Sequence, residues 1–310
     1  MDFRVTFLGT GAGYPTPARG ATALAVERGR QLVLLDCGEG TLRAMQAAGV
    51  GYGRLRAVFL SHFHADHCLG LPGLLQTFQL MGRERRLDVY GPPGVRDFLH
   101  RAVNLAPFSP GFCTVAHELE PGEVVELSGL TVTCAWMDHT APVLGYRLQE
   151  PDRPGRLDAP RASALGVPEG PAMGQLQRGE AVTTPAGRPV TPAEVVGPPR
   201  RGRGLVFSSD TRPCPALTDL ARGADLLVHD ATFTEAHRAR ARETGHSTAR
   251  QAGQTAAQAG VGALWLWHFS QRYRDEEAHL AEAREVFAAT EAGADGLKVA
   301  LSADDADERR

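Results

Sequence analysis

Several features that would narrow the function of this 310-residue chain are scarce in its sequence or missing from it. Nowhere do about 18 apolar residues follow one another, so no membrane-spanning helix is expected. The amino terminus alternates like a β-strand and lacks the basic and apolar regions of a secretion signal. The five cysteines show no paired spacing, which excludes a disulfide framework and predicts a reduced, cytoplasmic protein.

The charge of the chain also gives little information about its partners. The formal net charge is −3, so no overall positive field indicates nucleic-acid binding, and a polyanion would have to be held by a local patch or by bound metal ions. Lys298 is the only lysine, and arginine supplies the remaining positive charge. With 43% hydrophobic residues, the chain can bury a full core as one large domain or two ordinary domains.

The most informative segment that is present runs from Ser61 to His67, with the sequence Ser-His-Phe-His-Ala-Asp-His. It places four potential metal ligands, His62, His64, Asp66 and His67, directly after an apolar run. Imidazole nitrogens and carboxylate oxygens suit zinc and similar divalent ions, but four ligands at this spacing would crowd a single ion. Two adjacent metal ions are therefore predicted. The alternative, that these histidines are solvated or only hydrogen-bonded, fits a single loop histidine better than this cluster.

Other short apolar runs also end in residues that can do chemistry, as strands do when they lead into active-site loops. They are Leu32–Leu35 before Asp36, Ala57–Leu60 before the histidine motif, Thr131–Met137 before Asp138 and His139, Leu205–Ser209 before Asp210, Asp225–Val228 before His229 and Asp230, and Ala263–Trp267 before His268. Helices are expected between them, at Thr41–Ala48, Leu71–Leu80 and Ser247–Ala259. Because the strands are apolar throughout, we expect an α/β protein in which two sheets are buried on both faces, an αββα sandwich with the site at one edge.

The segment 150–204 differs from its neighbours because it is rich in proline, glycine and arginine. Ten prolines break any long regular element, and the segment interrupts the series of strands between His139 and Asp210. We interpret residues 1–310 as one domain from which 150–204 is an excursion, whose arginines could meet phosphates. The alternative is a flexible surface linker.

These residues resemble the metallo-β-lactamase superfamily and, more closely, the short form of the ribonuclease Z family, over almost the whole chain. The matching stretches are Gly9-Thr10-Gly11, Asp36 to Thr41, the histidine motif with Gly70 to Leu75, Tyr90 to Gly94, Gly145-Tyr146-Arg147, Gly197 to Arg200, Asp210 to Pro213, Gly245 to Thr248, and His268 to Tyr273. The resemblance implies a hydrolase, an endoribonuclease that removes the 3′ trailer from precursor transfer RNA and leaves a 3′ hydroxyl. It also implies a homodimer, and it implies that 150–204 is an inserted substrate-binding arm that contacts the RNA by backbone shape.

The resemblance also supplies the pairing of distant ligands, which spacing alone cannot give. It implies two divalent ions, expected to be zinc, held by His62, His64 and His139 on one side, by Asp66, His67 and His268 on the other, and by Asp210 between them. Asp66 is a candidate general base. His246 matches the family histidine that protonates the leaving ribose oxygen, and Asp230 stands where the family has its partner glutamate.

Three positions depart from the family pattern. Asp230 is one methylene shorter than glutamate, so its contact with His246 is expected to need a water molecule or a shifted loop. Ser209 replaces a glycine, which is expected to change only a turn, and Arg19-Gly20 replaces an Arg-Asn pair. The family links that loop to discrimination at the transfer RNA terminus, and Arg19 is interpreted as a candidate phosphate contact.

Two other functions remain open at this point. One is a different dinuclear-metal hydrolase on the same scaffold, such as a phosphodiesterase or sulfatase acting on small molecules, since one fold hosts many reactions. A noncatalytic RNA-binding protein is the other, although it would have no use for a complete set of ligands. A redox di-iron site is disfavoured because His64 stands where that branch of the superfamily has a carboxylate.

Overall fold

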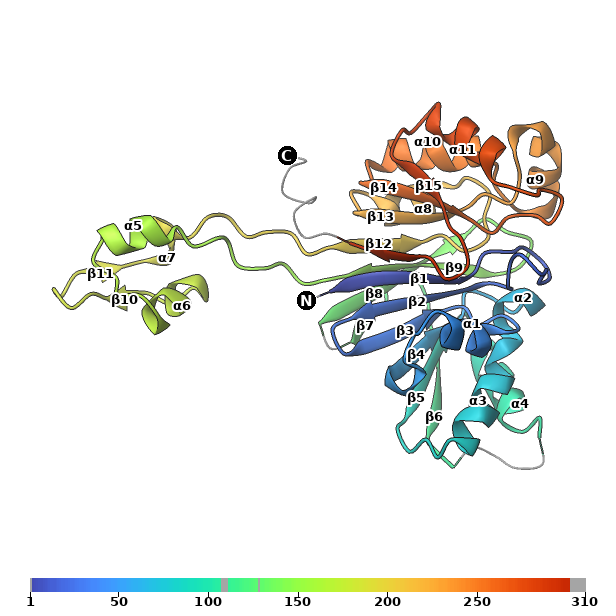
Figure 1. The fold of residues 1–310 in the computed structure, drawn as a ribbon, viewed down its shortest axis with the longest axis horizontal. Coiled ribbons are helices and arrows are strands. Elements are labelled where there is room, and N and C mark those ends of the chain that lie inside the picture. Colours follow the sequence, from blue (N-terminus) through green and yellow to red (C-terminus); the bar gives the residue numbers. More distant parts are fainter. Residues whose placement is uncertain (1, 107–110, 128, 302–310) are drawn as a thin grey trace.

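The computed structural model describes residues 2–106, 111–127 and 129–301 and shows two β-sheets packed face to face with helices on both outer surfaces (Figure 1). This αββα sandwich confirms the predicted fold class. Residues 302–310 of the domain predicted over 1–310 lie outside the described ranges. No helix in the described ranges is long and apolar enough to cross a membrane.

The first sheet combines antiparallel strands at one side with parallel strands at the other. In spatial order its strands are β16 (Lys298–Ala300), β1 (Phe3–Gly9), β2 (Ala23–Arg28), β3 (Gln31–Leu35), β4 (Leu55–Phe59), β5 (Leu87–Gly91) and β6 (Thr114–Glu118). Its outer face is covered by α1 (Thr41–Ala47), α3 (Gly70–Leu80) and α4 (Val95–Val103). The short turns η1 (Tyr52–Arg54) and α2 (Ala65–Cys68) flank β4.

The second sheet has the same construction. Its strands in spatial order are β15 (Thr290–Ala292), β14 (Ala263–Trp267), β13 (Leu226–Asp230), β12 (Gly204–Phe207), β9 (Val143–Gln149), β8 (Leu130–Met137) and β7 (Val124–Leu127). Its outer face carries α8 (Pro215–Ala221), α10 (Ala249–Ala259) and α11 (Glu277–Arg284). The turn η2 (Glu235–His237) and α9 (Arg238–Thr244) lie between β13 and α10.

Alternation along the strands explains why both faces of each sheet are dry. In β3, Val33 and Leu35 join the core between the sheets, whereas Leu32 and Leu34 face the helices. A strand has a side-chain period of two, so a continuously apolar strand buries both of its faces. The expectation drawn from the apolar runs is confirmed.

Two buried hydrogen bonds join the sheets close to the ends of the strands that lead into the histidine motif and His268. Trp267 Nε1 donates to the carbonyl of Gly9 at 3.0 Å, and the Tyr146 hydroxyl donates to the carbonyl of Leu60 at 2.6 Å. Both donors are fully buried, so each bond satisfies a polar group that burial would otherwise penalise. The end of β14 is thereby tied to β1, and the end of β4 is tied to β9, just before each chain enters the site.

The segment 150–204 projects away from the sandwich on two extended chains that run side by side (Figure 1). Arg153 and Arg200 exchange backbone hydrogen bonds of 2.8 and 2.9 Å across these chains. The tip contains α5 (Ala159–Ala164), α6 (Pro171–Gln177), β10 (Val182–Thr183), β11 (Pro189–Val190) and α7 (Pro192–Val195). Its apolar residues form a separate small core: Ala162, Val167, Leu176, Val182, Val190 and Val195. The flexible-linker alternative is therefore wrong.

The base of this projection is fixed by an ion-pair network. Glu150 is 4% exposed and accepts hydrogen bonds from Arg203 Nε at 2.7 Å and from Arg28 Nε at 2.8 Å. Arg203 also donates to the carbonyl of Leu301 at 2.7 Å, beyond the end of β16. These contacts tie both chains of the projection to the edge of the first sheet.

Candidate metal centre

The candidate site lies where β3, β4, β8, β12, β13 and β14 end, at one edge of the sandwich. His62 and His67 are completely buried after β4, and His64 is an exposed residue at the start of α2. His139 follows β8, Asp210 lies three residues after β12, and His268 follows β14. The structure thus brings together ligands from both sheets that lie up to about 200 residues apart in the sequence.

Hydrogen bonds at Nδ1 fix the tautomers of two of these histidines. His67 Nδ1 lies 2.8 Å from Asp36 Oδ2, and His139 Nδ1 lies 2.7 Å from the carbonyl of Gly245. A carboxylate or a carbonyl can only accept, so Nδ1 carries the proton and Nε2 presents a lone pair. This arrangement is typical of imidazoles that bind metal through Nε2.

Two hydroxyl groups fix the other pair in the same way. The Ser61 hydroxyl donates to Asp36 Oδ2 at 2.8 Å, so it can accept from His62 Nδ1 at 2.9 Å. The Thr232 hydroxyl donates to a carboxylate at 2.7 Å and can accept from His268 Nδ1 at 2.9 Å. The Nε2 atoms of His62, His67, His139 and His268 are buried, and none has a hydrogen-bond partner among the described residues. Four buried lone pairs without a partner fit a bound cation.

Asp210 lies between the two groups of histidines. Its Oδ2 is 3.3 Å from His67 Nε2 and 3.8 Å from His62 Nε2, and its Oδ1 is 3.4 Å from His268 Nε2. Asp66 Oδ2 lies 3.5 Å from the Nε2 atoms of both His67 and His268. Zinc–nitrogen bonds of about 2.0–2.1 Å in a tetrahedron separate neighbouring ligand atoms by roughly 3.3–3.4 Å. The observed separations are therefore suitable for ligands that share an ion.

The candidate ligand atoms form overlapping groups in which all members lie within 4.8 Å of one another. One group contains His62, His64, His139 and Asp210, and another contains Asp66, His67 and His268. These groups have the composition that the family resemblance implies. A further group joins Asp210 and His268 to Asp230 and His246, but those last two residues are hydrogen-bonded to each other.

The electrostatics of the site differ between its imidazoles: burial keeps His62 and His139 neutral, whereas buried carboxylates favour positive charge at His67. Burial lowers the pKa of His62 well below its usual value, with neighbouring histidines adding to the effect, and burial also lowers the pKa of His139. Burial works against protonation of His67 too, but Asp210 and Asp36 outweigh it and raise its pKa. The carboxylates thus attract positive charge to the centre of the cluster.

Backbone strain is concentrated around the cluster. Asp36, Ser209 and His268 have φ angles of 59°, 52° and 65°, and they are the only described non-glycine residues in the left-handed region. All three lie just after a strand that leads into the site. Such conformations cost about 1–3 kcal/mol each and tend to occur where a side chain must be aimed precisely at a functional site.

His246 and Asp230 are in direct contact beside the metal cluster. His246 Nδ1 lies 2.8 Å from Asp230 Oδ2, so the two side chains meet directly and the expectation of a bridging water molecule was wrong. The contact is possible because Asp230 ends β13 and is fully buried, directly opposite the loop that precedes α10. Burial opposes protonation of His246, but the carboxylate of Asp230 outweighs it and raises the histidine pKa to about 9.

The role expected for Arg19 does not agree with its surroundings. Its guanidinium donates to Glu276 Oε1 at 2.5 Å and to the carbonyl of Tyr273 at 3.1 Å, and it lies over the ring of Phe269 at 5.3 Å. Only 11% of its side chain is exposed. Arg19 therefore clamps the segment after His268 and is not free to contact a phosphate, so that interpretation was wrong.

Three residues to which the sequence analysis assigned no role support the candidate ligands. Asp36 receives hydrogen bonds from the backbone and hydroxyl of Ser61 and from His67, and Thr232 connects Asp230 to His268. Only their positions in the sequence could have indicated these roles. Asp36 follows a predicted strand, Ser61 precedes His62, and Thr232 lies two residues after Asp230.

Comparisons with known proteins agree with this geometry. The family model described as a beta-lactamase superfamily domain matches residues 31–155 and 182–269. The chain is 48% identical to ribonuclease Z of Myxococcus xanthus, over 96% of this chain and 97% of that protein. It is 46% identical to ribonuclease Z of Methanosarcina acetivorans, over 92% and 93% of the two chains. The crystal structure of the short form of human tRNase Z is similar with a TM-score of 0.70 and 27% identity, over 96% of this chain and 99% of that one.

Proposed function

Because this chain belongs to the ribonuclease Z family of the metallo-β-lactamase superfamily, we propose that it is a metal-dependent endoribonuclease that removes the 3′ trailer from precursor transfer RNA. Phosphodiester hydrolysis would leave a 3′ hydroxyl on the transfer RNA. The observation that carries the proposal is the joint presence of near full-length relatives and a complete, pre-oriented set of ligands.

We propose that two divalent ions, zinc above all, are held by seven residues. They are His62, His64, Asp66, His67, His139, Asp210 and His268. Two adjacent divalent ions supply an activated water for in-line attack and neutralise the charge of the phosphoryl group. The mixture of imidazole and carboxylate ligands supports zinc. Asp66 has one oxygen fixed by the backbone amide of Gly13 at 2.6 Å, which supports a role in orienting or deprotonating the water.

His246 is proposed as the donor of a proton to the leaving ribose oxygen. Its hydrogen bond to Asp230 keeps the ring oriented and favours the protonated form at neutral pH. A general acid needs the proton available and aimed at the leaving atom. The His246 ring centroid is 5.2 Å from that of His268 and 5.0 Å from that of His139, so the donor borders the proposed metal centre.

We propose that segment 150–204 is a substrate-binding arm within a single-domain protein. It projects far from the sandwich, which supports contact with a distant part of a folded RNA (Figure 1). Arg161, Arg178 and Arg188 lie on the exposed part of its tip, where they could contact the RNA backbone without reading bases. A homodimer and a cytoplasmic location are proposed with it, on the family resemblance and on the five free thiols.

The alternative of another dinuclear-metal hydrolase is not favoured. It would use the same ligands, but it would give no role to the projecting arm or to the His246–Asp230 pair. The noncatalytic alternative would leave the buried Nε2 lone pairs without a purpose.

The test is an assay with a precursor transfer RNA that carries a 3′ trailer, using purified protein supplied with zinc or manganese. Wild type should cut beside the discriminator base and leave a 3′ hydroxyl, whereas Asp66→Ala and His246→Ala should bind the RNA but not cut it at a comparable rate. His100→Ala is the matched control, because His100 is exposed and lies outside the site. Hydrolysis of a simple phosphodiester with an untouched precursor would instead support the alternative hydrolase.

A further inference from the structure

A pocket of about 300 Å³ is lined in part by His246. Its lining includes Arg212, Arg238 and Arg242 together with Asp138 and His246. Four segments meet there: the residues after β8, the loop after β12, helix α9 and the start of α10. His246 therefore borders both the candidate metal centre and this pocket.

The arginines of the pocket differ in how far their charges are already used. Arg212 donates to Asp138 Oδ1 at 2.9 Å and to the carbonyl of Arg242 at 2.7 Å, so it fixes helix α9 against the site. Arg238 donates to Glu235 at 2.9 Å, and its side chain is 65% exposed. Arg242 is exposed, and no carboxylate in the described parts of the chain forms an ion pair with it. The pocket therefore carries an excess of positive charge.

The spacing within α9 directs two of these charges to one face. Arg238 and Arg242 are four residues apart, so they are neighbours on the helix surface. Arg240 lies two residues from each, does not line the pocket, and pairs with Glu243 at 2.7 Å. The same short helix thus provides both a candidate contact and an internal control.

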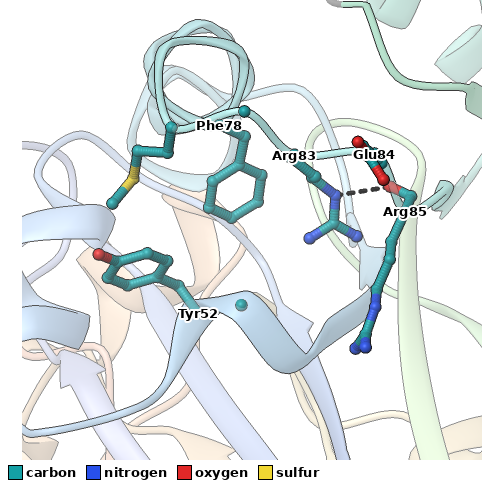
Figure 2. A pocket seen from close by; sticks show the side chains of 8 residues that line it. Tyr52, Phe78, Arg83, Glu84 and Arg85 are labelled. Carbon is teal, nitrogen blue, oxygen red and sulfur yellow. Dashed lines mark hydrogen bonds between the residues drawn. The ribbon is translucent and has the colours of Figure 1, made fainter.

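Not every arginine-lined pocket in this protein has free charge. A pocket of about 340 Å³ near the start of β4 is lined by Tyr52, Phe78 and Arg83 (Figure 2). There the Arg83 guanidinium donates to the carbonyls of Arg85, Leu55 and Arg86 at 2.8–3.0 Å. The Arg83 donors are engaged by the backbone, and of the other two charged residues in the lining, Glu84 offsets the charge of Arg85, so this pocket offers an anion less than the pocket beside His246 does.

We propose that the pocket formed by Arg212, Arg238 and Arg242 binds a backbone phosphate of the substrate RNA, namely the phosphate immediately 5′ to the discriminator nucleotide. This inference rests on the proposed function, in which His246 faces the leaving ribose oxygen. The nucleotide that keeps this oxygen continues to its own 5′ phosphate, so the next anion of the chain lies on the His246 side of the cut. Arginine guanidinium groups are well suited to phosphate oxygens because they donate several parallel hydrogen bonds.

The contact would help to position the reaction as well as to bind the RNA. A phosphate held next to His246 fixes the ribose whose oxygen must receive the proton. Charge-assisted hydrogen bonds are the stronger class of such contacts, but partial exposure reduces their effect. Loss of the Arg242 charge should therefore lower kcat/KM by about tenfold, and loss of the Arg238 charge, already shared with Glu235, by about threefold.

The experiment compares two substrates with two matched variants. One precursor transfer RNA is unmodified, and the other carries a neutral methylphosphonate in place of the phosphate 5′ to the discriminator. The neutral phosphate loses its interaction with both Arg242 and Arg238, so wild type and Arg240→Gln should lose about thirtyfold in kcat/KM on the modified substrate. Arg242→Gln should already be about tenfold slower and should lose only about threefold more. The salt dependence of binding should also weaken, by about 0.7–0.9 in the logarithmic slope, in Arg242→Gln alone.

The inference is overturned if Arg242→Gln behaves like Arg240→Gln, or if the losses from the variant and from the modified phosphate multiply to about three-hundredfold. Thermal unfolding of both variants verifies that each is folded. Failure of wild type to cut the unmodified precursor is a separate outcome, which refutes the proposed function and this inference with it. Inhibition by inorganic phosphate that is equal in wild type and Arg242→Gln would show that free phosphate does not use the pocket, and it would count against the subsite.

Discussion

Replacing Asp36 by asparagine should weaken metal binding although Asp36 is not a proposed ligand. Its carboxylate is fully buried and accepts three hydrogen bonds: from the Ser61 amide at 2.7 Å, the Ser61 hydroxyl at 2.8 Å and His67 Nδ1 at 2.8 Å. Asparagine has the same shape, but its NH₂ group must face one of these donors. If it faces His67, the ring is driven to the tautomer that carries the proton on Nε2, where the ion would bind.

The expected reduction in metal affinity follows from the loss of a carboxylate that orients a metal-binding imidazole. Such changes reduce metal affinity by roughly 10- to 100-fold, which corresponds to about 1.4–2.8 kcal/mol. Asp36 contacts His67 directly and reaches His62 through Ser61, so both proposed ions should be affected. Ser61→Ala keeps the contact with His67 and should weaken mainly the ion bound by His62.

The assay is a competition titration of the metal-free protein against a chromophoric zinc chelator, with two binding constants fitted. Asp88→Asn is the control, because Asp88 also accepts from a histidine, His117 Nε2 at 2.7 Å, but on β5 and outside the cluster. A folded Asp36→Asn protein with wild-type affinity for both ions would refute the proposed role of the hydrogen bonds. An equal loss in Asp88→Asn would show that the effect is not specific to the site.

Three further predictions concern stability and rate. Ser209→Gly should stabilise the protein by about 1–2 kcal/mol, because it relieves the left-handed backbone conformation of a residue with a side chain and also removes a buried hydroxyl without a described partner. Ser209→Ala removes only the hydroxyl and should stabilise the protein less. Equal free energies of unfolding in urea for the two variants would contradict the backbone explanation. Burial of Glu150 raises its pKa, but Arg203 and Arg28 outweigh this effect and lower the pKa to about 2. The stabilisation that ionised Glu150 provides should be complete above pH 4.5 and lost as the pH falls toward 2. Glu150→Gln should therefore flatten the acid limb of the curve of stability against pH and lower the free energy of unfolding at pH 7 by on the order of 3 kcal/mol. Asp230→Asn should lower kcat for precursor cleavage by about 100-fold or more with little change in KM, since His246 loses its charged partner, and single-turnover kinetics that show a pure KM effect would exclude this role.

Local sequence patterns were sufficient to predict the strands that lead into the site and the helix after His246. The apolar run before the histidine motif became β4, and the helix expected after His246 became α10, whose N-terminal cap is Thr248; the Thr248 hydroxyl accepts from the Gln251 amide at 3.3 Å. Gly260 ends that helix with φ of 62°, as glycine does at a left-handed cap. Such features depend on neighbours within a few residues, so the sequence carries them directly.

Contacts between segments that lie far apart in the sequence could not be predicted from local patterns. Arg19 and Glu276 are 257 residues apart, and the sequence does not indicate that they meet. Whether Asp230 reaches His246 directly is set by how β13 and the loop before α10 lie against each other, so the length of the side chain alone could not decide it. Ser209 shows the same limit, because a replaced glycine signals a strained turn only when its φ angle is known.

The short acid at position 230 also connects the proposed proton donor to the metal ligands. One oxygen of Asp230 accepts from His246, and the other accepts from the Thr232 hydroxyl, which in turn accepts from His268. All of these groups except His246 are at most 3% exposed, so water cannot replace a lost partner without cost. A glutamate would place one more methylene in this fully buried position and shift both oxygens, and overpacking of that kind costs about 1–3 kcal/mol. Aspartate is therefore the acid that fits this chain, and the orientation of the donor and that of His268 depend on the same carboxylate.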